Sequence, residues 1–414
     1  MEVGETQRTP YTESAEGGGK INNYVCAESL SKDNQNITES QVFARVADKY
    51  FQKVTTPDGN SVWMARDKQE LKADGVVLGH IPKYYGFTVE HNFTDYRPEI
   101  NGWLNLSTAL RWQPIEGYFP TITKLFKHIF GEQLDIGYDR YSLLVRNPHQ
   151  LQPILVVTSR EQGTGKTTLL FFDSLLFGCN AVILNVSQYS QQFNGLFASK
   201  LTIGIDETVI SESFIKERLK QDSTAKNIQL RKMHTEHQTL PFYGKFTLCT
   251  NRETDFATLE EEDMRFWVRK VGRIEDFDPD FETKIAEEMP HFLYFLLHRD
   301  LATPKPLSRQ WFSREQLYTD ALENVLTNSR TDCAKDIQLF VEEKLAEIKG
   351  FGITASELRR ELGYKHSIND VSKAIREELK IEVKNSSYTD MYGTTRKGRY
   401  YQFGEKMEGI GLPY

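Results

Sequence analysis

The stretch ILVVTSREQGTGKTTLLFFDSLLFG, residues 154–178, predicts a strand, a loop and a helix in succession. Its beginning, ILVVTS, is a continuous apolar run of the kind that is buried on both faces of a parallel sheet. The glycine-rich GTGKT at 163–167 follows, and TTLLFFDSLLFG has helical character. Backbone N–H groups in such a loop and at the start of such a helix cradle polyphosphates. We therefore predict a nucleotide-phosphate site; the alternative reading is a chance glycine-rich turn.

Two side chains of this loop have predicted roles. Lys166 is expected to reach the β- and γ-phosphates of a nucleotide, and Thr167 is expected to offer its hydroxyl to Mg²⁺. The loop departs from the full Gly-x-x-x-x-Gly-Lys pattern, because Arg160 stands at the first glycine position. The predicted nucleotide-binding residues are Gly163, Thr164, Gly165, Lys166, Thr167 and Thr168.

Three more apolar runs predict strands: AVILNV at 181–186, LTIGID at 201–206 and KFTLCT at 245–250. Helix-like or hairpin-like sequence separates them, and this alternation favours an α/β fold with a parallel sheet. The second run ends in two acids. Asp206 is predicted to hold Mg²⁺ together with Thr167, and Glu207 is predicted to polarise the attacking water. The alternative is an ordinary solvated strand end.

Two residues further along complete the predicted catalytic set. Asn251 follows the third run, where an amide can hydrogen-bond the γ-phosphate or the attacking water without adding charge; the alternative is an asparagine that caps a turn. Arg265 is the candidate arginine finger, because a bidentate guanidinium stabilises charge on a phosphoryl group during transfer. The alternative for Arg265 is a salt bridge to Glu261 or Glu262 in the same chain.

A basic segment lies between the second and third of these strands. Residues 216–245 hold seven Lys or Arg against three Asp or Glu, although the whole chain has a net charge of −7. The sequence IQLRKM-HTEHQ-TLPFYG reads as two strands joined by a polar turn. Such a basic hairpin, which includes Arg231, is suited to gripping nucleic-acid phosphates. The alternative is an edge hairpin whose lysines resist aggregation.

Composition limits the class of protein. The 414 residues are 39% hydrophobic and 26% charged, which is typical of a soluble multidomain protein. Four widely spaced cysteines predict neither a disulfide framework nor a zinc site. The absence of an 18-residue apolar run or a signal-peptide pattern predicts a cytoplasmic protein with no membrane contact. The negative net charge argues against wholesale coating of nucleic acid, so that only local patches are expected to bind it.

Composition and periodicity divide the chain into seven predicted segments. From Ser40 the run ESQVFARVADKYFQKV has helical spacing, and three helices followed by a hairpin near the C-terminus suggest a winged helix. The segments are 1–39, disordered; 40–110, a small α+β subdomain; 111–150, a helical collar; 151–303, a P-loop ATPase domain; 304–334, a linker and helix; 335–404, a winged-helix-like domain; and 405–414, a tail.

The order GTGKT, LTIGIDE, basic hairpin, TLCTNRE, DMRFW resembles that of the superfamily 3 helicases of viruses, phages and plasmids. The motifs fall within about 105 residues, a compact spacing as in that family. The upstream stretches GWLNLSTALRWQPIEGY and LLVRNPHQLQPILVV are similar to the helicase half of phage and mobile-element primase-helicases. The resemblance covers roughly residues 100–300.

The resemblance implies an AAA+ type ATPase ring, usually a hexamer, that uses ATP and Mg²⁺. Such a ring moves along single-stranded DNA with 3′-to-5′ polarity and separates duplex at a fork. The family's DNA-binding hairpin falls here around Lys232 and His234, and Met264 stands where relatives often carry a second arginine. The family's catalytic positions fall on Lys166, Asp206, Glu207, Asn251 and Arg265.

Two other functions stay open at this point. One is a nucleotide-dependent DNA-binding initiator or loader that does not unwind DNA. The other is a P-loop switch or defence ATPase that acts on protein partners. The resemblance places the protein in a bacterial cytosol or a phage-infected cell, and priming is expected to be done by a separate primase or polymerase.

Overall fold

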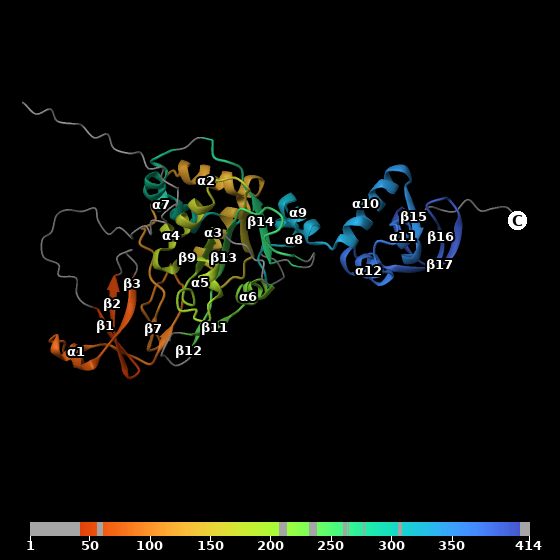
Figure 1. The fold of residues 1–414 in the computed structure, drawn as a ribbon. Coiled ribbons are helices and arrows are strands. Elements are labelled where there is room, and N and C mark those ends of the chain that lie inside the picture. The colour runs from red at the N-terminus through yellow and green to blue at the C-terminus, as the bar shows by residue number, and fades with distance from the viewer. Residues whose placement is uncertain are drawn as a thin grey trace, which may run out of the picture. The chain divides into compact units, whose positions relative to one another are not determined.

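The computed structural model describes residues 42–55, 61–206, 213–231, 238–259, 263, 265–275, 278–304 and 309–405. The chain divides into two compact units, Met1–Lys83 and Tyr84–Tyr414. Figure 1 labels their elements. The segment 1–39, for which we predicted disorder, lies outside the described residues.

The first unit begins with an antiparallel hairpin, so the helix predicted from Ser40 is wrong. Ala44, Val46 and Tyr50 are buried while their neighbours are more exposed, which is the two-residue period of a strand rather than helical spacing. Ala47, with φ 53°, lies in the tight turn between the two strands. The elements are β1 (Phe43–Val46), β2 (Lys49–Thr55), β3 (Ser61–Arg66), α1 (Lys68–Ala73) and η1 (Leu78–His80).

The second unit is built around a parallel five-stranded sheet, which confirms the predicted α/β class. The strand order is β14-β8-β13-β10-β9. Residues 154–157 are completely buried, as expected for an apolar run covered on both faces. Four strands were predicted from their apolar runs, and the edge strand β14 was not. The strands are β8 (Ile154–Thr158), β9 (Ala181–Asn185), β10 (Thr202–Asp206), β13 (Lys245–Thr250) and β14 (Phe266–Lys270).

Helices cover this sheet (Figure 1). They bury an aromatic cluster against it. The ring of Phe126 packs within 5.3 Å, centroid to centroid, of those of Tyr138, Tyr141, Phe172 and Phe292. Such contacts join four helices into one apolar layer. They are α2 (Pro120–Phe130) and α3 (Leu134–Arg146), the two helices of the segment predicted to be a collar, with α4 (Lys166–Phe177) and α7 (Phe281–His298).

Residues 84–110 belong to the unit of the parallel sheet, whereas the sequence grouped them with residues 40–83. The physical reason is a buried polar contact. The Ser107 hydroxyl donates to Asn180 Oδ1 at 3.1 Å, and Asn180 Nδ2 donates to the Thr108 carbonyl at 2.8 Å. Asn180 ends η3 (Gly178–Asn180) after α4. This segment contains β5 (Phe87–Thr88), β6 (Glu99–Ile100) and β7 (Trp103–Asn105), and β4 (Lys83–Tyr84) spans the division.

The predicted basic hairpin has both of its strands. β11 (Asn227–Leu230) pairs antiparallel with β12 (Gln238–Pro241), and Leu230 lies opposite Gln238. α5 (Val186–Ser190) and α6 (Ser213–Asp222) precede them. The hairpin turn at 232–237 lies outside the described residues.

The C-terminal part has the three predicted helices and the predicted hairpin. They enclose a separate core that includes Ile337, Phe351, Leu358, Ile375 and Tyr401. A further short strand, β15, pairs with the hairpin and makes a sheet with the order β15-β17-β16. After α8 (Arg314–Leu317) and α9 (Asp320–Ser329), the elements are α10 (Asp332–Glu347), β15 (Gly350–Ile353), α11 (Ala355–Glu361), α12 (Ile368–Lys373), η4 (Ala374–Glu378), β16 (Val383–Thr389) and β17 (Thr395–Gly404).

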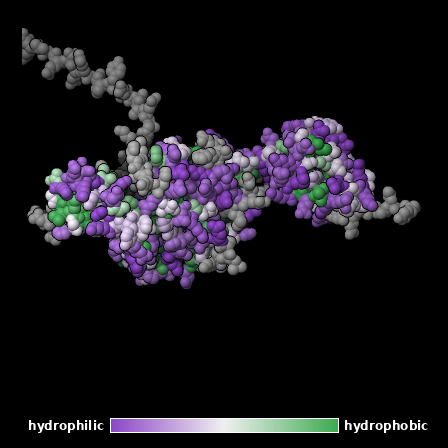
Figure 2. Space-filling view, turned by 90° about the horizontal axis from the view of Figure 1, so that it is seen from below, coloured by the Kyte–Doolittle hydropathy of each residue, from purple (hydrophilic) through white to green (hydrophobic). Residues whose placement is uncertain are grey.

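Hydrophilic residues cover most of the face seen in Figure 2, with hydrophobic residues in small patches. None of the helices within the described ranges has the length and apolar character needed to cross a membrane.

Candidate functional site

The loop between β8 and α4 has a backbone that only glycine adopts easily at two positions. Gly163 and Gly165 have φ values of 68° and 77°, in the left-handed region where a Cβ is strained. At Gly165 a Cβ would also lie 3.2 Å from the side chain of Ile274. Two contacts from other segments hold the loop: Ile274 N donates to the Gly163 carbonyl at 3.1 Å, and His128 Nε2 lies 3.1 Å from the Thr164 carbonyl.

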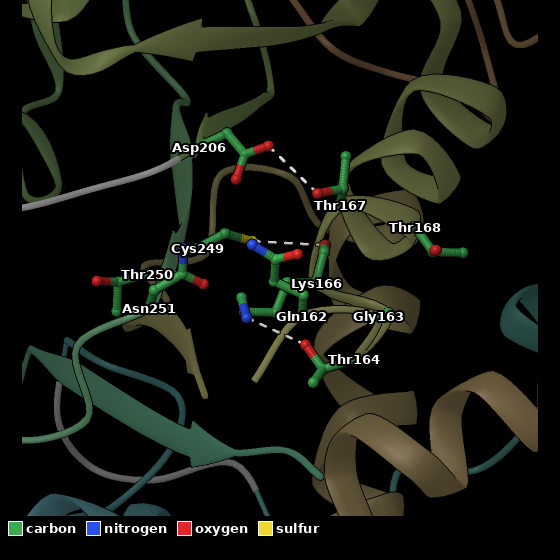
Figure 3. A pocket seen from close by; sticks show the side chains of 11 residues that line it. Gln162, Gly163, Thr164, Lys166, Thr167, Thr168, Asp206, Cys249, Thr250 and Asn251 are labelled. Atoms are coloured by element: carbon green, nitrogen blue, oxygen red, sulfur yellow. Dashed lines mark hydrogen bonds between the residues drawn. The ribbon is translucent and has the colours of Figure 1, made fainter. Parts of the chain in front are cut away.

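This loop borders an open pocket of about 310 Å³ at the carboxyl ends of β8, β10 and β13 (Figure 3). Three of the predicted motifs meet there, although about 85 residues separate the first from the last. All six predicted nucleotide-binding residues line the pocket. The lining is Gln162, Gly163, Thr164, Gly165, Lys166, Thr167, Thr168, Asp206, Cys249, Thr250 and Asn251.

Lys166 is the first residue of α4, and its ammonium group lies against neutral acceptors of the loop. Nζ is 3.0 Å from Thr164 Oγ1, 3.3 Å from the Glu161 carbonyl and 3.4 Å from the Ser159 carbonyl. Burial lowers the pKa of Lys166, because removal from water disfavours the charged form. An anion in the pocket would favour the charged form of Lys166 and so raise its pKa again. The free N–H groups at the start of α4 add further positive potential at the same place.

Thr167 and Asp206 bring two oxygen atoms together across the pocket (Figure 3). Thr167 Oγ1 donates to Asp206 Oδ2 at 3.3 Å. Hydroxyl and carboxylate oxygens are ligands that Mg²⁺ accepts, and this ion commonly binds through one or two carboxylates plus substrate phosphates. The described residues contain no cluster of three or more His, Cys, Asp or Glu that would enclose a metal by themselves. The pair therefore fits a magnesium ion that is shared with a phosphate.

Asn251 follows β13 and lines the pocket beside Lys166. The end of β13 is tied to the loop, because Ser159 N donates to the Thr250 carbonyl at 3.2 Å. The buried thiol of Cys249 lies 3.4 Å from the Lys166 carbonyl. The sequence analysis missed Gln162, Cys249 and Thr250 as lining residues. Their signal was positional, since Gln162 directly precedes the predicted Gly163, and Cys249 and Thr250 are the two residues before the predicted Asn251.

Arg160, which replaces the first glycine of the loop pattern, does not occupy the pocket lining. Its side chain is 75% exposed and its Nε lies 3.5 Å from Glu253 Oε2. The Arg160 N–H also donates to Glu253 Oε1 at 3.3 Å, and Lys270 pairs with the same carboxylate at 3.0 Å. The beginning of the loop, at Arg160, is therefore held at the surface by ion pairs of Glu253 with Arg160 and Lys270.

The structure does not bring Arg265 to this pocket. The Arg265 carbonyl accepts a hydrogen bond from Ile154 N, at the start of β8, whereas the glycine-rich loop follows the end of β8. A five-residue strand spans roughly 16 Å, so the two lie at opposite edges of the sheet. The Arg265 side chain is 41% exposed and lies 3.9 Å from Asp263, which pairs with Lys220 at 2.6 Å.

The other predicted residues are placed only in part. Glu207, Lys232 and His234 lie outside the described residues. Arg231 directly follows β11, where its N–H donates to Asn194 Oδ1 at 2.8 Å and its side chain is exposed. The described base of the hairpin is therefore anchored by backbone hydrogen bonds, and the Arg231 guanidinium is accessible to a partner.

The fold and the site together define an α/β protein with a parallel sheet, in which a glycine-rich loop, a lysine and a helix N-terminus form an anion-accepting pocket. Residues 157–269 match the model of a family of unknown function (DUF5906). This segment contains every residue that lines the pocket. No curated protein matches the chain.

Solved structures share the fold over most of the chain. Two structures titled as the apo form of the NrS-1 C terminal region, residues 305–718, align with TM-scores of 0.60 and 0.62 at 15% and 14% identity. Each covers 88% of this chain and 96% of that one. A third structure of the same region has a TM-score of 0.57 at 12% identity, with 86% and 94% covered. At this identity the likeness concerns the fold.

Proposed function

We propose that this chain is an ATP-dependent DNA helicase with an AAA+ type core, acting in the replication of a phage, plasmid or mobile element. The observation that carries the proposal is the convergence of Lys166, Thr167, Asp206 and Asn251 on one pocket beside a glycine-rich loop. The fold shared with the NrS-1 C terminal region supports it.

The order of the sheet supports the ATPase part of the proposal. The glycine-rich loop follows β8, Asp206 ends β10, and β13 with Asn251 lies between these two strands. Carboxyl ends of parallel strands meet at one edge of a sheet, where ligands of such folds bind. An acid and an amide from neighbouring strands thus line the same pocket.

The proposed roles follow from the positions of the side chains. Lys166 is expected to leave its carbonyl partners for phosphate oxygens, while Thr167 and Asp206 hold Mg²⁺. Asn251 would orient the attacking water, and Glu207 would polarise it. ATP supplies the phosphoryl group when it is bound. Arg265, at the far edge of the sheet, would serve the pocket of a neighbouring subunit, which agrees with the proposed homo-oligomer, a hexamer.

The proposed helicase moves along single-stranded DNA in the 3′-to-5′ direction, and the basic hairpin binds this strand. Arg231 at its base is exposed, as phosphate contact requires. Lys232 and His234 are proposed to continue this contact at the turn. We propose that the C-terminal helices and three-stranded sheet form a winged helix, and that forked duplex and a separate primase or polymerase are further partners.

The test is ATP hydrolysis by the purified chain with and without single-stranded DNA. We expect DNA to stimulate turnover, Lys166→Ala to abolish it, and forked DNA to be unwound only by the parent. Ser174→Ala is the matched control, because its hydroxyl bonds only within α4, to the Leu170 carbonyl. Turnover that is indifferent to DNA contradicts the helicase proposal.

A second function differs in one property. A nucleotide-dependent initiator or loader would bind ATP and DNA at the same sites without strand separation. The isolated C-terminal core gives this alternative its support, since it provides a second module that could recognise DNA. ATP-dependent DNA binding without displacement of a strand from a fork would favour it.

A further inference from the structure

The first residue of β7, Trp103, holds an aromatic ring at the surface. Its side chain is 40% exposed, whereas Leu104 and Asn105, which follow it, are buried. The Asn105 side chain fixes the strand, because Nδ2 donates to the Glu90 carbonyl at 3.0 Å and Oδ1 accepts from Ser107 N at 3.0 Å. A rigid backbone therefore presents the indole to solvent.

The indole lies beside the base of the basic hairpin. A Cβ on Gly86, just before β5, would lie 2.8 Å from Trp103 Cε3 and 3.1 Å from Gln238 Nε2, so both side chains meet above this glycine. Gln238 is the first residue of β12, and its amide donates to the Phe87 carbonyl. Within the described ranges no other ring packs on the indole. The ring is therefore covered by Gly86 on one side and is open beside the hairpin.

The strand register separates this ring from the nearest acid. Trp103 pairs with Ile100 of β6, and Glu99 is the residue before Ile100. Successive residues of a strand point to opposite sides, so Glu99 lies on the side away from the indole. A second exposed ring, that of Tyr85, lies over Gly102 and so on the same side as Glu99. An anionic chain is therefore favoured on the Trp103 side, because the other side carries a carboxylate.

The hairpin next to Gln238 supplies hydrogen-bond donors and positive charge. Its described residues, 226–231 and 238–241, include no Asp or Glu. Gln229 pairs with Thr239, and both side chains are exposed, as is that of Arg231. Arg231 forms no ion pair within the part of the chain that the structure describes. These groups are suited to phosphate oxygens, and the indole beside them is suited to a base.

We propose that Trp103 stacks on an unpaired base of the single-stranded DNA whose phosphates contact the hairpin. The inference rests on the proposed function and adds to it a residue that binds a base. Every base has a π face, so the contact is tolerant of sequence. Bases of a duplex already stack on one another and leave no face for the ring. A protein partner is less suited, because the strand neighbours on this side, Gly86 and Ile100, offer a single half-buried apolar side chain.

The experiment measures binding of the full chain, without nucleotide, to a deoxythymidine strand and to a strand of abasic sites of equal length. The two ligands carry the same phosphates and differ only in their bases. We expect Trp103→Leu to bind the thymidine strand at least about fivefold more weakly than the parent and the abasic strand within about twofold of it. Trp103→Phe restores a ring and should retain most of the affinity. The salt slope should not change, because no charge is removed.

The matched control is Tyr85→Leu, which removes an exposed ring from the opposite side of the same strands and is expected to leave both affinities unchanged. Parental binding of the thymidine strand by Trp103→Leu would overturn the proposal. An equal loss on both strands, or an equal loss for Tyr85→Leu, would do the same. A parent that binds the thymidine strand more tightly than the abasic strand, but whose ATP turnover ignores DNA, would contradict the helicase proposal and leave the stacking site intact.

Discussion

At the scale of single residues, the Thr167 hydroxyl 3.3 Å from Asp206 makes a sharp test of the proposed magnesium site. We expect Thr167→Ala to lower ATP turnover on the order of 100-fold, the size of effect seen when one well-placed electrostatic contact is lost. Raised Mg²⁺ should restore part of the rate. Turnover is measured against Mg²⁺ concentration, with Ser174→Ala as control. A variant with parental turnover at low Mg²⁺ would remove Thr167 from the site.

Asp173 makes stability depend on pH. It is a buried residue of α4 that accepts a 2.6 Å hydrogen bond from the Tyr141 hydroxyl, and burial raises its pKa from 3.8 to about 6. The folded chain thus holds this proton more tightly than the unfolded chain. The carboxyl group favours folding at low pH, and this contribution is lost as pH rises through about 6.

We therefore expect Asp173→Asn to raise stability at pH 7.5 by at most about 3 kcal/mol and to have little effect near pH 3.8. Asparagine can still accept the Tyr141 hydrogen bond. Denaturant unfolding at several pH values measures the difference, and Asp300→Asn on the surface is the control. A difference that is constant with pH would contradict the assignment.

At the scale of elements, α2, α3, α4 and α7 depend on one aromatic layer. Phe126 lies at its centre and is fully buried. We expect Phe126→Ala to destabilise the parallel-sheet unit by about 3 to 5 kcal/mol, because transfer and cavity costs add. Thermal unfolding gives the measurement. Tyr118→Ala, at a side chain that is 92% exposed, should change little. Equal effects for the two variants would show that the layer does not limit stability.

Elements also show why some sequence-based predictions failed. The apolar residues in the run from Ser40 match both the period of a helix and that of a strand. The antiparallel pairing of β1 with β2 stabilises the strand conformation. β14 was missed because its apolar residues sit beside a charged motif, and only pairing with β8 reveals it. β15, with two glycines in four residues, carries almost no strand signal.

At the scale of the whole molecule, the positions of Lys166 and Arg265 at opposite edges of the sheet predict complementation between subunits. Lys166→Ala and Arg265→Ala are each expected to lose turnover as pure oligomers. Mixed together, they should regain part of it, because some interfaces then pair an intact lysine with an intact arginine. Turnover and mass in solution are recorded for each mixture. A mixture that stays inactive, or full turnover by pure Arg265→Ala, would contradict a finger acting between subunits.

The sequence by itself determined the α/β class, four strands of the parallel sheet, the glycine-rich loop, and the three helices and hairpin near the C-terminus. These features are local, because apolar runs, glycines and helical periodicity act over a few neighbouring residues. Only the tertiary structure decided that residues 84–110 belong to the unit of the parallel sheet and that the Cys249 thiol lies 3.4 Å from the Lys166 carbonyl. Those outcomes depend on contacts between distant segments, which strand pairing and burial select and no short stretch of sequence encodes.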